Sequence, residues 1–225
     1  MKKAVVLLSG GLDSAVTLYL AKSKGFECSC LIFNYGQRHK KEIERAKLIA
    51  QSAHCPYKVL NISLPWKGSS LFSGKIPEAA RSQGHKVTGI IPSTYVPARN
   101  IIFLSFAASF AETIKAGSIF IGAHAQDYSG YPDCRPEFYR AFNRALLKGT
   151  KAGVESAGIK IVTPIVHKRK SQIIRLGQKL GVPFALTWSC YNAGKVPCGK
   201  CDSCYYRAKG FKEAGINDPL TDYRL

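Results

Sequence analysis

The alternation of apolar runs and amphipathic stretches along the chain predicts an α/β protein. Short apolar runs typical of buried parallel strands recur at residues 4–8, 28–33, 57–62, 118–122 and 159–165. Stretches with a helical spacing of apolar residues lie between and after them, at residues 13–24, 40–53, 100–115, 137–147 and 170–180. Because strands that alternate with helices form βαβ units, we expect a doubly wound, mostly parallel sheet.

Two parts of the chain break this alternation. Residues 64–97 are rich in Gly, Ser and Pro and are too long for a plain connection, so we expect a functional loop or lid there. From Trp188 onward the pattern changes to loops, cysteines and one helical stretch at residues 203–214. We therefore expect an α/β domain over residues 1–187 and a small C-terminal segment over residues 188–225.

The loop that follows the first apolar run has the sequence SGGLDS, at residues 9–14. A strand, a tight Ser/Gly loop and a helix N-terminus form an anion site, because backbone N–H groups converge there and the helix dipole favours negative charge. The lysine of a Walker A loop is missing. The loop resembles the SGGxDS loop of the ATP pyrophosphatases, which implies binding of the β,γ-pyrophosphate of ATP and release of AMP and pyrophosphate. A glycine-rich turn that ends in a helix N-cap is the alternative.

Individual residues of this loop have chemical roles. The Asp13 carboxylate, next to a polyphosphate, is suited to hold Mg²⁺, which prefers one or two carboxylates together with phosphate oxygens. A helix N-cap is the other role open to Asp13, and the two roles are compatible. Ser9 and Ser14 would donate their hydroxyls to the phosphates. We predict that the nucleotide is bound by the residues in and around the loop and by one arginine: Leu8, Ser9, Gly10, Gly11, Leu12, Asp13, Ser14, Ala15, Val16, Thr17, Leu18 and Arg38.

Two arginines are candidates for holding negative charge on the triphosphate or on a substrate carboxylate. They are Arg38 and Arg99, and guanidinium pairs with either anion in a bidentate way. A solvated surface role is the alternative for each. Arg99 stands out because residues 95–100 close the long loop and open a helix. We predict that Asp13, Ser14 and Arg99 are the catalytic residues.

The segment at residues 127–137, DYSGYPDCRPE, combines tyrosines, carboxylates and an arginine with turn-forming residues. Such a loop offers aromatic faces on which a flat base can stack, and carboxylates that accept hydrogen bonds from ring N–H and amino groups. We predict that Tyr128 or Tyr131 stacks on the base and that Asp133 and Glu137 accept its donors. A Gly/Pro turn with ordinary surface charges is the alternative.

Four of the eight cysteines crowd near the end of the chain: Cys190, Cys198, Cys201 and Cys204. Four thiolates suit a tetrahedral Zn²⁺, and a closed site of this kind is structural, so we predict one structural zinc ion per chain. An iron–sulfur cluster is one alternative, although no Cys-Pro follows at the spacing found in ferredoxins. Free or redox-active cysteines are another alternative. Uneven cysteine usage favours reduced thiols, which places the protein in the cytoplasm.

The chain of 225 residues carries a formal net charge of +19. Such a charge fits either a nucleic-acid footprint or a surface that attracts anionic small molecules such as ATP. The basic residues are dispersed and form no arginine-rich tail, so we interpret the charge as a general attraction to phosphates and do not expect direct nucleic-acid binding. No segment approaches transmembrane length, and we expect no membrane contact.

Five motifs taken together resemble the 7-cyano-7-deazaguanine synthases, over Lys3 to about Asp218: SGGLDS, NYGQRHKKE, TYVPARN, DYSGYPDCRPEF and SCY-x6-CGKCDSC-x2-R. The resemblance implies a Rossmann-like fold of the PP-loop, adenine nucleotide alpha hydrolase type. It implies conversion of 7-carboxy-7-deazaguanine, ammonia and ATP to the nitrile, through an adenylated acid and an adenylated amide, in queuosine biosynthesis. It also implies a homodimer. The chain is too short to carry a glutaminase domain as well, so we expect free ammonia as the nitrogen source.

Two other functions stay open at this point. One is a PP-loop enzyme that modifies tRNA directly; the basic charge favours it, whereas the YPDCR motif and the lack of an appended RNA-binding domain count against it. The other is a non-catalytic zinc-ribbon regulator that binds nucleic acid. In such a regulator the ATP loop would be vestigial. The complete set of Ser9, Asp13 and Ser14 argues against this.

Overall fold

The computed structural model describes residues 2–37, 40–64, 69–72, 91, 93–124, 130–192 and 194–220. Its centre is a five-stranded sheet in the order β3-β2-β1-β4-β5, in which every neighbouring pair is parallel. The strands are β1 (Lys2–Leu7), β2 (Phe26–Asn34), β3 (Tyr57–Asn61), β4 (Ser118–Phe120) and β5 (Lys160–Val162). The doubly wound parallel sheet expected from the hydrophobic pattern is confirmed.

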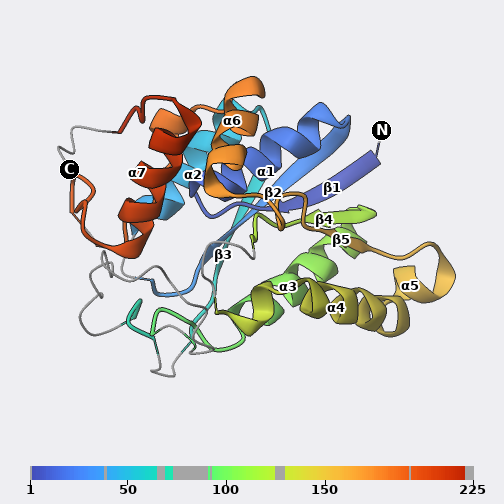
Figure 1. The fold of residues 1–225 in the computed structure, drawn as a ribbon. Helices are drawn as coiled ribbons and strands as arrows, with labels where there is room; N and C mark the ends of the chain where they lie inside the picture. The colour runs from blue at the N-terminus through green and yellow to red at the C-terminus, as the bar shows by residue number, and fades with distance from the viewer. Residues whose placement is uncertain are drawn as a thin grey trace.

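Helices follow the strands in the expected alternation (Figure 1). They are α1 (Leu12–Ser23), α2 (Lys40–Ser52), α3 (Arg99–Thr113), α4 (Pro136–Gly149), α5 (Lys151–Glu155), α6 (Lys170–Lys179) and α7 (Asp202–Ala214), with 3-10 turns η1 (Pro132–Cys134) and η2 (Phe184–Leu186). The apolar pattern missed α5 and both 3-10 turns, because elements of three to five residues are too short to display a period.

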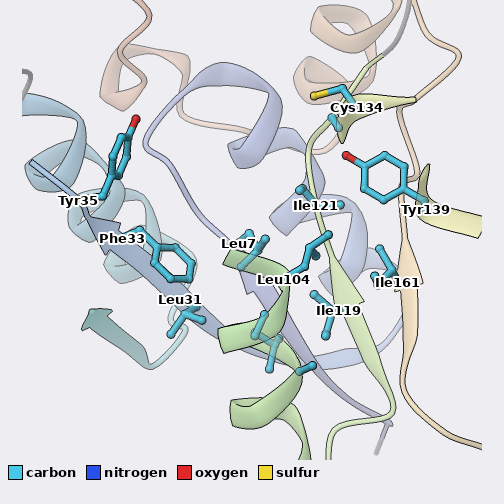
Figure 2. Packing of buried hydrophobic residues seen from close by; sticks show 14 of the residues in the cluster. Leu7, Leu31, Phe33, Tyr35, Leu104, Ile119, Ile121, Cys134, Tyr139 and Ile161 are labelled. Atoms are coloured by element: carbon cyan, nitrogen blue, oxygen red, sulfur yellow. The ribbon is translucent and has the colours of Figure 1, made fainter. Parts of the chain in front are cut away.

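Two apolar cores lie on opposite faces of the sheet. Residues of β1 alternate between them: Val5 and Leu7 pack with α3 and α4, whereas Ala4 and Val6 pack with α1, α2, α6 and α7. Figure 2 shows the first core, where Leu104 of α3 lies among Leu7 and Ile119 of the strands. Both faces are covered, so the strands are apolar on both sides and read as continuous apolar runs.

The order of the strands fixes where a ligand can bind. The chain moves outward from β1 through β2 to β3 and then returns to the other side of β1 at β4. Ligands of such open parallel sheets bind at this switch point, outside the carboxyl ends of the strands. A ligand site is therefore expected at the loops that follow β1 and β4.

The C-terminal segment packs closely on the sheet domain. Helix α7 lies on α6, and Phe211 of α7 is buried in the core that also contains α1. Arg207 of α7 is buried and forms a bidentate ion pair with Asp218, at 2.7 and 2.8 Å, and also donates to Thr187 at 2.8 Å. The boundary at residues 187 and 188 stays a prediction. Over the described residues, we find no helix with the length and apolar character needed to cross a membrane.

Candidate active site at the carboxyl ends of β1 and β4

The SGGLDS loop connects β1 to α1, and two glycines let neighbouring backbone approach it. Gly10 has a φ of +84°, and a Cβ atom there would lie 2.2 Å from the carbonyl oxygen of Glu42 on α2. Gly122, just after β4, meets the loop from the other side, since its Cβ would lie 2.8 Å from the backbone nitrogen of Ser14. Any side chain at either position would therefore displace the loop.

Side-chain hydroxyls hold the loop in shape. Ser14 Oγ accepts the backbone N–H of Ser9 at 3.2 Å and donates to the carbonyl of Gly11 at 2.9 Å. The two hydroxyls, Ser9 Oγ and Ser14 Oγ, lie 3.1 Å apart. Ser9 is exposed, and Gly11 and Asp13 are partly exposed, so a helix N-terminus with its orphan N–H groups remains accessible to an anion.

Other residues predicted to bind the nucleotide lie behind the loop. The side chains of Leu8, Leu12, Ala15, Val16 and Leu18 are buried in the core beneath α1. Thr17 is also buried. These side chains anchor the loop and the first turns of α1, and contact with a ligand would come from the backbone of the loop. Arg38 lies outside the described residues.

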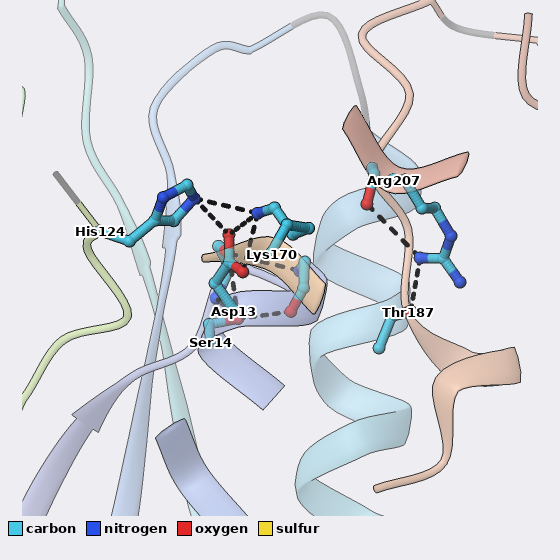
Figure 3. Close-up of polar contacts among 9 residues, drawn as sticks. Asp13, Ser14, His124, Lys170, Thr187 and Arg207 are labelled. Carbon is cyan, nitrogen blue, oxygen red and sulfur yellow. Dashed lines mark hydrogen bonds and ion pairs between the residues drawn. The ribbon is translucent and has the colours of Figure 1, made fainter. Parts of the chain in front are cut away.

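Asp13 forms a compact charged cluster with Lys170 and His124 (Figure 3). The Lys170 Nζ atom donates to both carboxylate oxygens of Asp13, at 2.9 and 2.8 Å, and lies 2.9 Å from Nε2 of His124. The same nitrogen of His124 is 3.3 Å from Asp13 Oδ2. Lys170 begins α6, and His124 follows β4, so the switch point assembles the cluster from three separate elements.

This cluster keeps Asp13 ionised. Burial on its own would raise the pKa of the carboxyl group, but the positive charge of Lys170 and the adjacent His124 hold that pKa well below its usual range. The side chains of Lys170 and Asp13 retain 14% and 25% exposure, so both remain partly accessible to solvent. The sequence analysis assigned no role to either partner of Asp13. The only signal for Lys170 was the basic cluster HKRK at residues 167–170.

A second polar group lies on the other side of the loop. Arg99, the first residue of α3, donates from Nη1 to the hydroxyl of Tyr35 at 3.3 Å, and its guanidinium lies 5.9 Å from the centre of that ring. Glu42 of α2 lies within electrostatic range of Arg99 and Tyr35. Burial raises the pKa of Glu42 to about 7, although the charge of Arg99 lowers it in part. Glu42 is the last residue of the NYGQRHKKE motif, but the sequence analysis assigned it no role.

The residues predicted from the sequence to bind the base differ in burial and in their contacts. Asp133 is buried, and its Oδ2 accepts the backbone N–H of Asn100 at 3.0 Å, at the start of α3. The Tyr131 hydroxyl lies 2.5 Å from Thr94 Oγ1. Glu137 instead lies on the exposed side of α4, where it pairs with Arg140 at 3.3 Å. Tyr128 lies outside the described residues.

The cysteine group is assembled as its spacing predicts. The ligand atoms of Cys190, Cys198, Cys201 and Cys204 all lie within 4.8 Å of one another. Backbone N–H groups point at the sulfurs: Asn192 and Cys198 donate to Cys190 Sγ at 3.3 Å, and Lys200 and Cys201 donate to Cys198 Sγ at 3.4 Å. Such donors stabilise thiolates, and four converging thiolates are a donor set that fits a tetrahedral metal ion.

The cysteine segment also contacts the SGGLDS loop. The backbone N–H of Trp188 donates to the carbonyl of Gly10 at 2.9 Å. Lys41 of α2 lies with its Nζ 3.9 Å from the centre of the Trp188 ring. Trp188, two residues before the first cysteine, therefore packs directly against the loop.

Comparisons with known proteins agree with this geometry. Among solved structures, a 4-thiouridine synthetase–RNA complex with bound ATP aligns with a TM-score of 0.53 and 17% identity, over 95% of this chain and 50% of the other. NMN synthetase from Francisella tularensis aligns with a TM-score of 0.50 and 16% identity, over 96% of this chain and 78% of the other. At these identities the likeness shows the fold alone.

Relatives in sequence are much closer. The chain is 52% identical over 220 residues to a 7-cyano-7-deazaguanine synthase of Picrophilus torridus, covering 98% of this chain and 91% of the relative. It is 50% identical to one of Trichormus variabilis, covering 97% of both chains. The family model of the queuosine biosynthesis protein QueC matches residues 3–215. With the loop, the charged cluster and the cysteine group in place, the chain belongs to the QueC family.

Proposed function

We propose that this protein is an ATP-dependent 7-cyano-7-deazaguanine synthase, which makes the nitrile from 7-carboxy-7-deazaguanine and ammonia. The observation that carries the proposal is the identity of about half of all residues to synthases of this name over nearly the whole chain. The SGGLDS loop at the switch point supports ATP as the cosubstrate, because its accessible N–H groups suit a pyrophosphate.

The reaction needs an activated carboxyl group, because oxide is a poor leaving group. In the first step the carboxylate oxygen attacks the α-phosphorus of ATP, pyrophosphate leaves, and an acyl adenylate forms. The loop holds the β- and γ-phosphates through its backbone N–H groups and the hydroxyls of Ser9 and Ser14. Lys170 neutralises charge on the departing pyrophosphate, since its ammonium group is already held at the cleft by Asp13.

Nitrile formation then follows from an acyl substitution, a second adenylation and an elimination. Ammonia attacks the acyl adenylate, AMP leaves with the electron pair of its C–O bond, and the amide forms as its nitrogen loses a proton to solvent. The amide oxygen attacks the α-phosphorus of a second ATP, pyrophosphate leaves, and the amide nitrogen loses a proton to give an adenylated imidate. AMP then leaves from this imidate as its nitrogen loses the last proton, which gives the nitrile. Each activation releases one pyrophosphate and one AMP. The same loop serves both activations, so the enzyme contributes mainly positioning and charge neutralisation.

Asp13 also fits a Mg²⁺ ion that arrives with ATP. Its carboxyl group is kept ionised by Lys170 and remains 25% exposed, which leaves oxygen lone pairs for a metal beside the phosphates. When bound, Mg²⁺ supplies further neutralisation of the triphosphate charge.

The deazaguanine base would bind on the other side of the loop, near Arg99. Two contacts support this assignment: Asp133, on the 3-10 turn η1, accepts the backbone N–H of Asn100 at the start of α3, and the hydroxyl of Tyr131 lies beside Thr94. Arg99 would pair with the carboxylate of the substrate before its activation. Tyr128 remains a stacking candidate, and Glu137 is a candidate only through a movement of its exposed side chain.

The four clustered cysteines would hold one structural zinc ion per chain. Their thiolates would supply the four ligands of the tetrahedral site that Zn²⁺ prefers, and such a site would leave no open position for catalysis. Bound zinc would tie together the segment whose residue Trp188 contacts Gly10. A cytoplasmic location and assembly as a homodimer stay predictions, the latter testable by sedimentation equilibrium.

The proposal is tested by incubating the protein with 7-carboxy-7-deazaguanine, ammonium and ATP, followed by mass analysis for the nitrile. Chromatography should show AMP and pyrophosphate, and stoichiometric ADP would contradict the assignment of the loop. A gel shift with tRNA across a salt series serves as the control. Tight, salt-resistant tRNA binding without nitrile formation would support the tRNA-modifying alternative instead.

A further inference from the structure

The aliphatic stem of Lys170 is confined by a neighbouring helix. A lysine side chain has many rotamers, and a charge stabilises a transition state best when it is already in place. A Cβ atom on Gly210 of α7 would overlap Cγ of Lys170, so the bare backbone at Gly210 leaves the space that this stem occupies. Helix α7 therefore packs directly on the stem of the lysine, and only the ammonium group at its end remains to be fixed.

The ammonium group lies within hydrogen-bond distance of three acceptor atoms in the described part of the chain. Lys170 Nζ is 2.9 and 2.8 Å from the two carboxylate oxygens of Asp13, and 2.9 Å from Nε2 of His124. An ammonium group carries three N–H donors and no acceptor, so each of these atoms can receive one hydrogen. Of the three acceptors, His124 provides the one that does not belong to Asp13.

The contact with Lys170 decides which nitrogen of the His124 ring carries the hydrogen. Because an ammonium group can only donate, Nε2 accepts and the ring hydrogen lies on Nδ1. Nε2 is also 3.3 Å from Oδ2 of Asp13. Two acceptor atoms this close repel each other unless they share a donor, and Lys170 Nζ lies within 2.9 Å of both (Figure 3). The three groups therefore form one closed triangle.

The backbone before His124 places its ring at the SGGLDS loop. Gly122 lies two residues earlier, just after β4, and a Cβ atom there would lie 2.8 Å from the carbonyl carbon of Asp13. The segment from β4 to His124 therefore runs directly against the backbone of the loop. The side chain of His124 is 13% exposed. His124 thus offers a nearly buried acceptor from the β4 side, whereas Asp13 holds the ammonium group from the side of α1.

We propose that His124 is a positioning residue for adenylation, which holds the ammonium group of Lys170 at the SGGLDS loop through the hydrogen bond to Nε2. The inference rests on the proposed function, in which Lys170 neutralises charge on the departing pyrophosphate. Without His124 the ammonium group keeps Asp13 as a partner but loses its acceptor on the β4 side. Its charge is then less well placed when the bond from the α-phosphorus to the bridging oxygen breaks. His124 transfers no proton in this role and acts on the reaction only through Lys170.

The kinetic test compares His124→Leu with His124→Gln in the exchange of pyrophosphate into ATP, driven by 7-carboxy-7-deazaguanine. Leucine removes the acceptor, whereas the amide oxygen of glutamine reaches the place of Nε2 and accepts from Lys170. In His124→Leu we expect kcat to fall by on the order of 10- to 100-fold, the range for one hydrogen bond to a charged group, with the KM for ATP changed less than about threefold. His124→Gln should stay within about threefold of the wild-type kcat.

Nitrogen NMR of protein with isotope-labelled histidine tests the contact itself, independently of activity. The ring of His124 should carry its hydrogen on Nδ1 and show a hydrogen-bonded Nε2. In Lys170→Met the Nε2 resonance should move toward that of a ring nitrogen that accepts no hydrogen bond. This measurement needs only the wild-type protein and Lys170→Met, so it decides the contact even where His124→Leu does not fold.

A matched control for the kinetic test is His167→Leu. His167 is exposed and lies in the turn before α6, three residues from Lys170, so the same substitution there removes an imidazole without touching the triangle. This variant should exchange pyrophosphate at the wild-type rate. A melting curve for each variant shows whether a loss of rate accompanies a loss of folded protein.

Each other outcome contradicts a different statement. A wild-type kcat in His124→Leu, or equal losses in His124→Leu and His124→Gln, would exclude a role for the acceptor. A raised KM for ATP with an unchanged kcat would show that His124 only supports the shape of the loop. A hydrogen on Nε2 of the native protein would contradict the contact with Lys170. Absence of exchange in the wild-type protein would instead contradict the proposed function, whatever NMR shows for His124.

Discussion

The ammonium group of Lys170 lies 2.9 and 2.8 Å from the two carboxylate oxygens of Asp13, although 157 residues separate them in the chain. The SGGLDS loop lacks the lysine that a Walker A loop carries within its own sequence. The fold brings a lysine to the loop from the start of α6. The pair therefore links the pyrophosphate loop to the last strand–helix unit of the sheet.

Replacement of Lys170 by Met should abolish most adenylation activity. The methionine retains much of the aliphatic stem and removes the charge that would stabilise the departing pyrophosphate, so we expect a loss of about 100- to 1,000-fold in acid-dependent AMP release. Lys179→Met, at the exposed end of the same helix, should leave the rate unchanged. Similar rates in the two variants would mean that Lys170 only neutralises Asp13.

Asp13→Asn should remove activity and also change how stability depends on pH. In the folded protein the pKa of Asp13 lies below its unfolded value, so its ionisation contributes stability that is present above about pH 4 and is lost as the pH falls toward the folded pKa. Urea unfolding should be compared at about pH 5 and about pH 3, on either side of the unfolded carboxyl pKa of roughly 4. Between these two conditions the variant should lose less free energy of unfolding than the wild type. An unchanged slope would assign the acid sensitivity to other carboxyl groups.

Cys201→Ser should cost the protein its metal, its thermal stability and part of its affinity for ATP. Structural zinc sites contribute roughly 10–16 kcal/mol of apparent binding free energy in small peptides. Because Trp188 donates to Gly10, loosening of the cysteine segment should also disturb the loop. Metal analysis, a melting curve and ATP titration measure the three effects. Cys28→Ser, in β2, should keep the zinc, and iron with a visible charge-transfer band in the native protein would overturn the zinc assignment.

Asp133→Asn should weaken binding of the deazaguanine base much more than binding of ATP. The asparagine side chain would still accept the N–H of Asn100 through its amide oxygen, so we expect only about 1 kcal/mol of destabilisation. Its amide nitrogen, however, would face the donors of a guanine-like ring. Calorimetric titration with each ligand measures the difference. Equal losses for base and ATP would show that the residue serves only to hold α3, and Glu155→Gln at an exposed position of α5 is the control.

The strands, the main helices and the phosphate loop could be predicted because each depends on neighbouring residues. Val5 and Leu7 belong to an uninterrupted apolar run, and the glycines of SGGLDS permit the sharp turn after it. The cysteine group was predictable for the same reason. Cys198, Cys201 and Cys204 follow one another at intervals of three residues, which keeps their sulfur atoms close together. The five-residue helix α5 escaped prediction because so short a pattern has no period.

The sequence by itself determined the elements of this protein, their order and two of its motifs, because all of these are written in residues close together along the chain. Only the tertiary structure decided which charged groups meet. It brought Lys170 and His124 to Asp13, turned one oxygen of Asp133 toward the start of α3, and left Glu42 beside Gly10. These contacts depend on the order of strands in the sheet, in which β4 returns beside β1, and on the depth at which each carboxyl group is buried. Neither quantity has a local signature in the sequence.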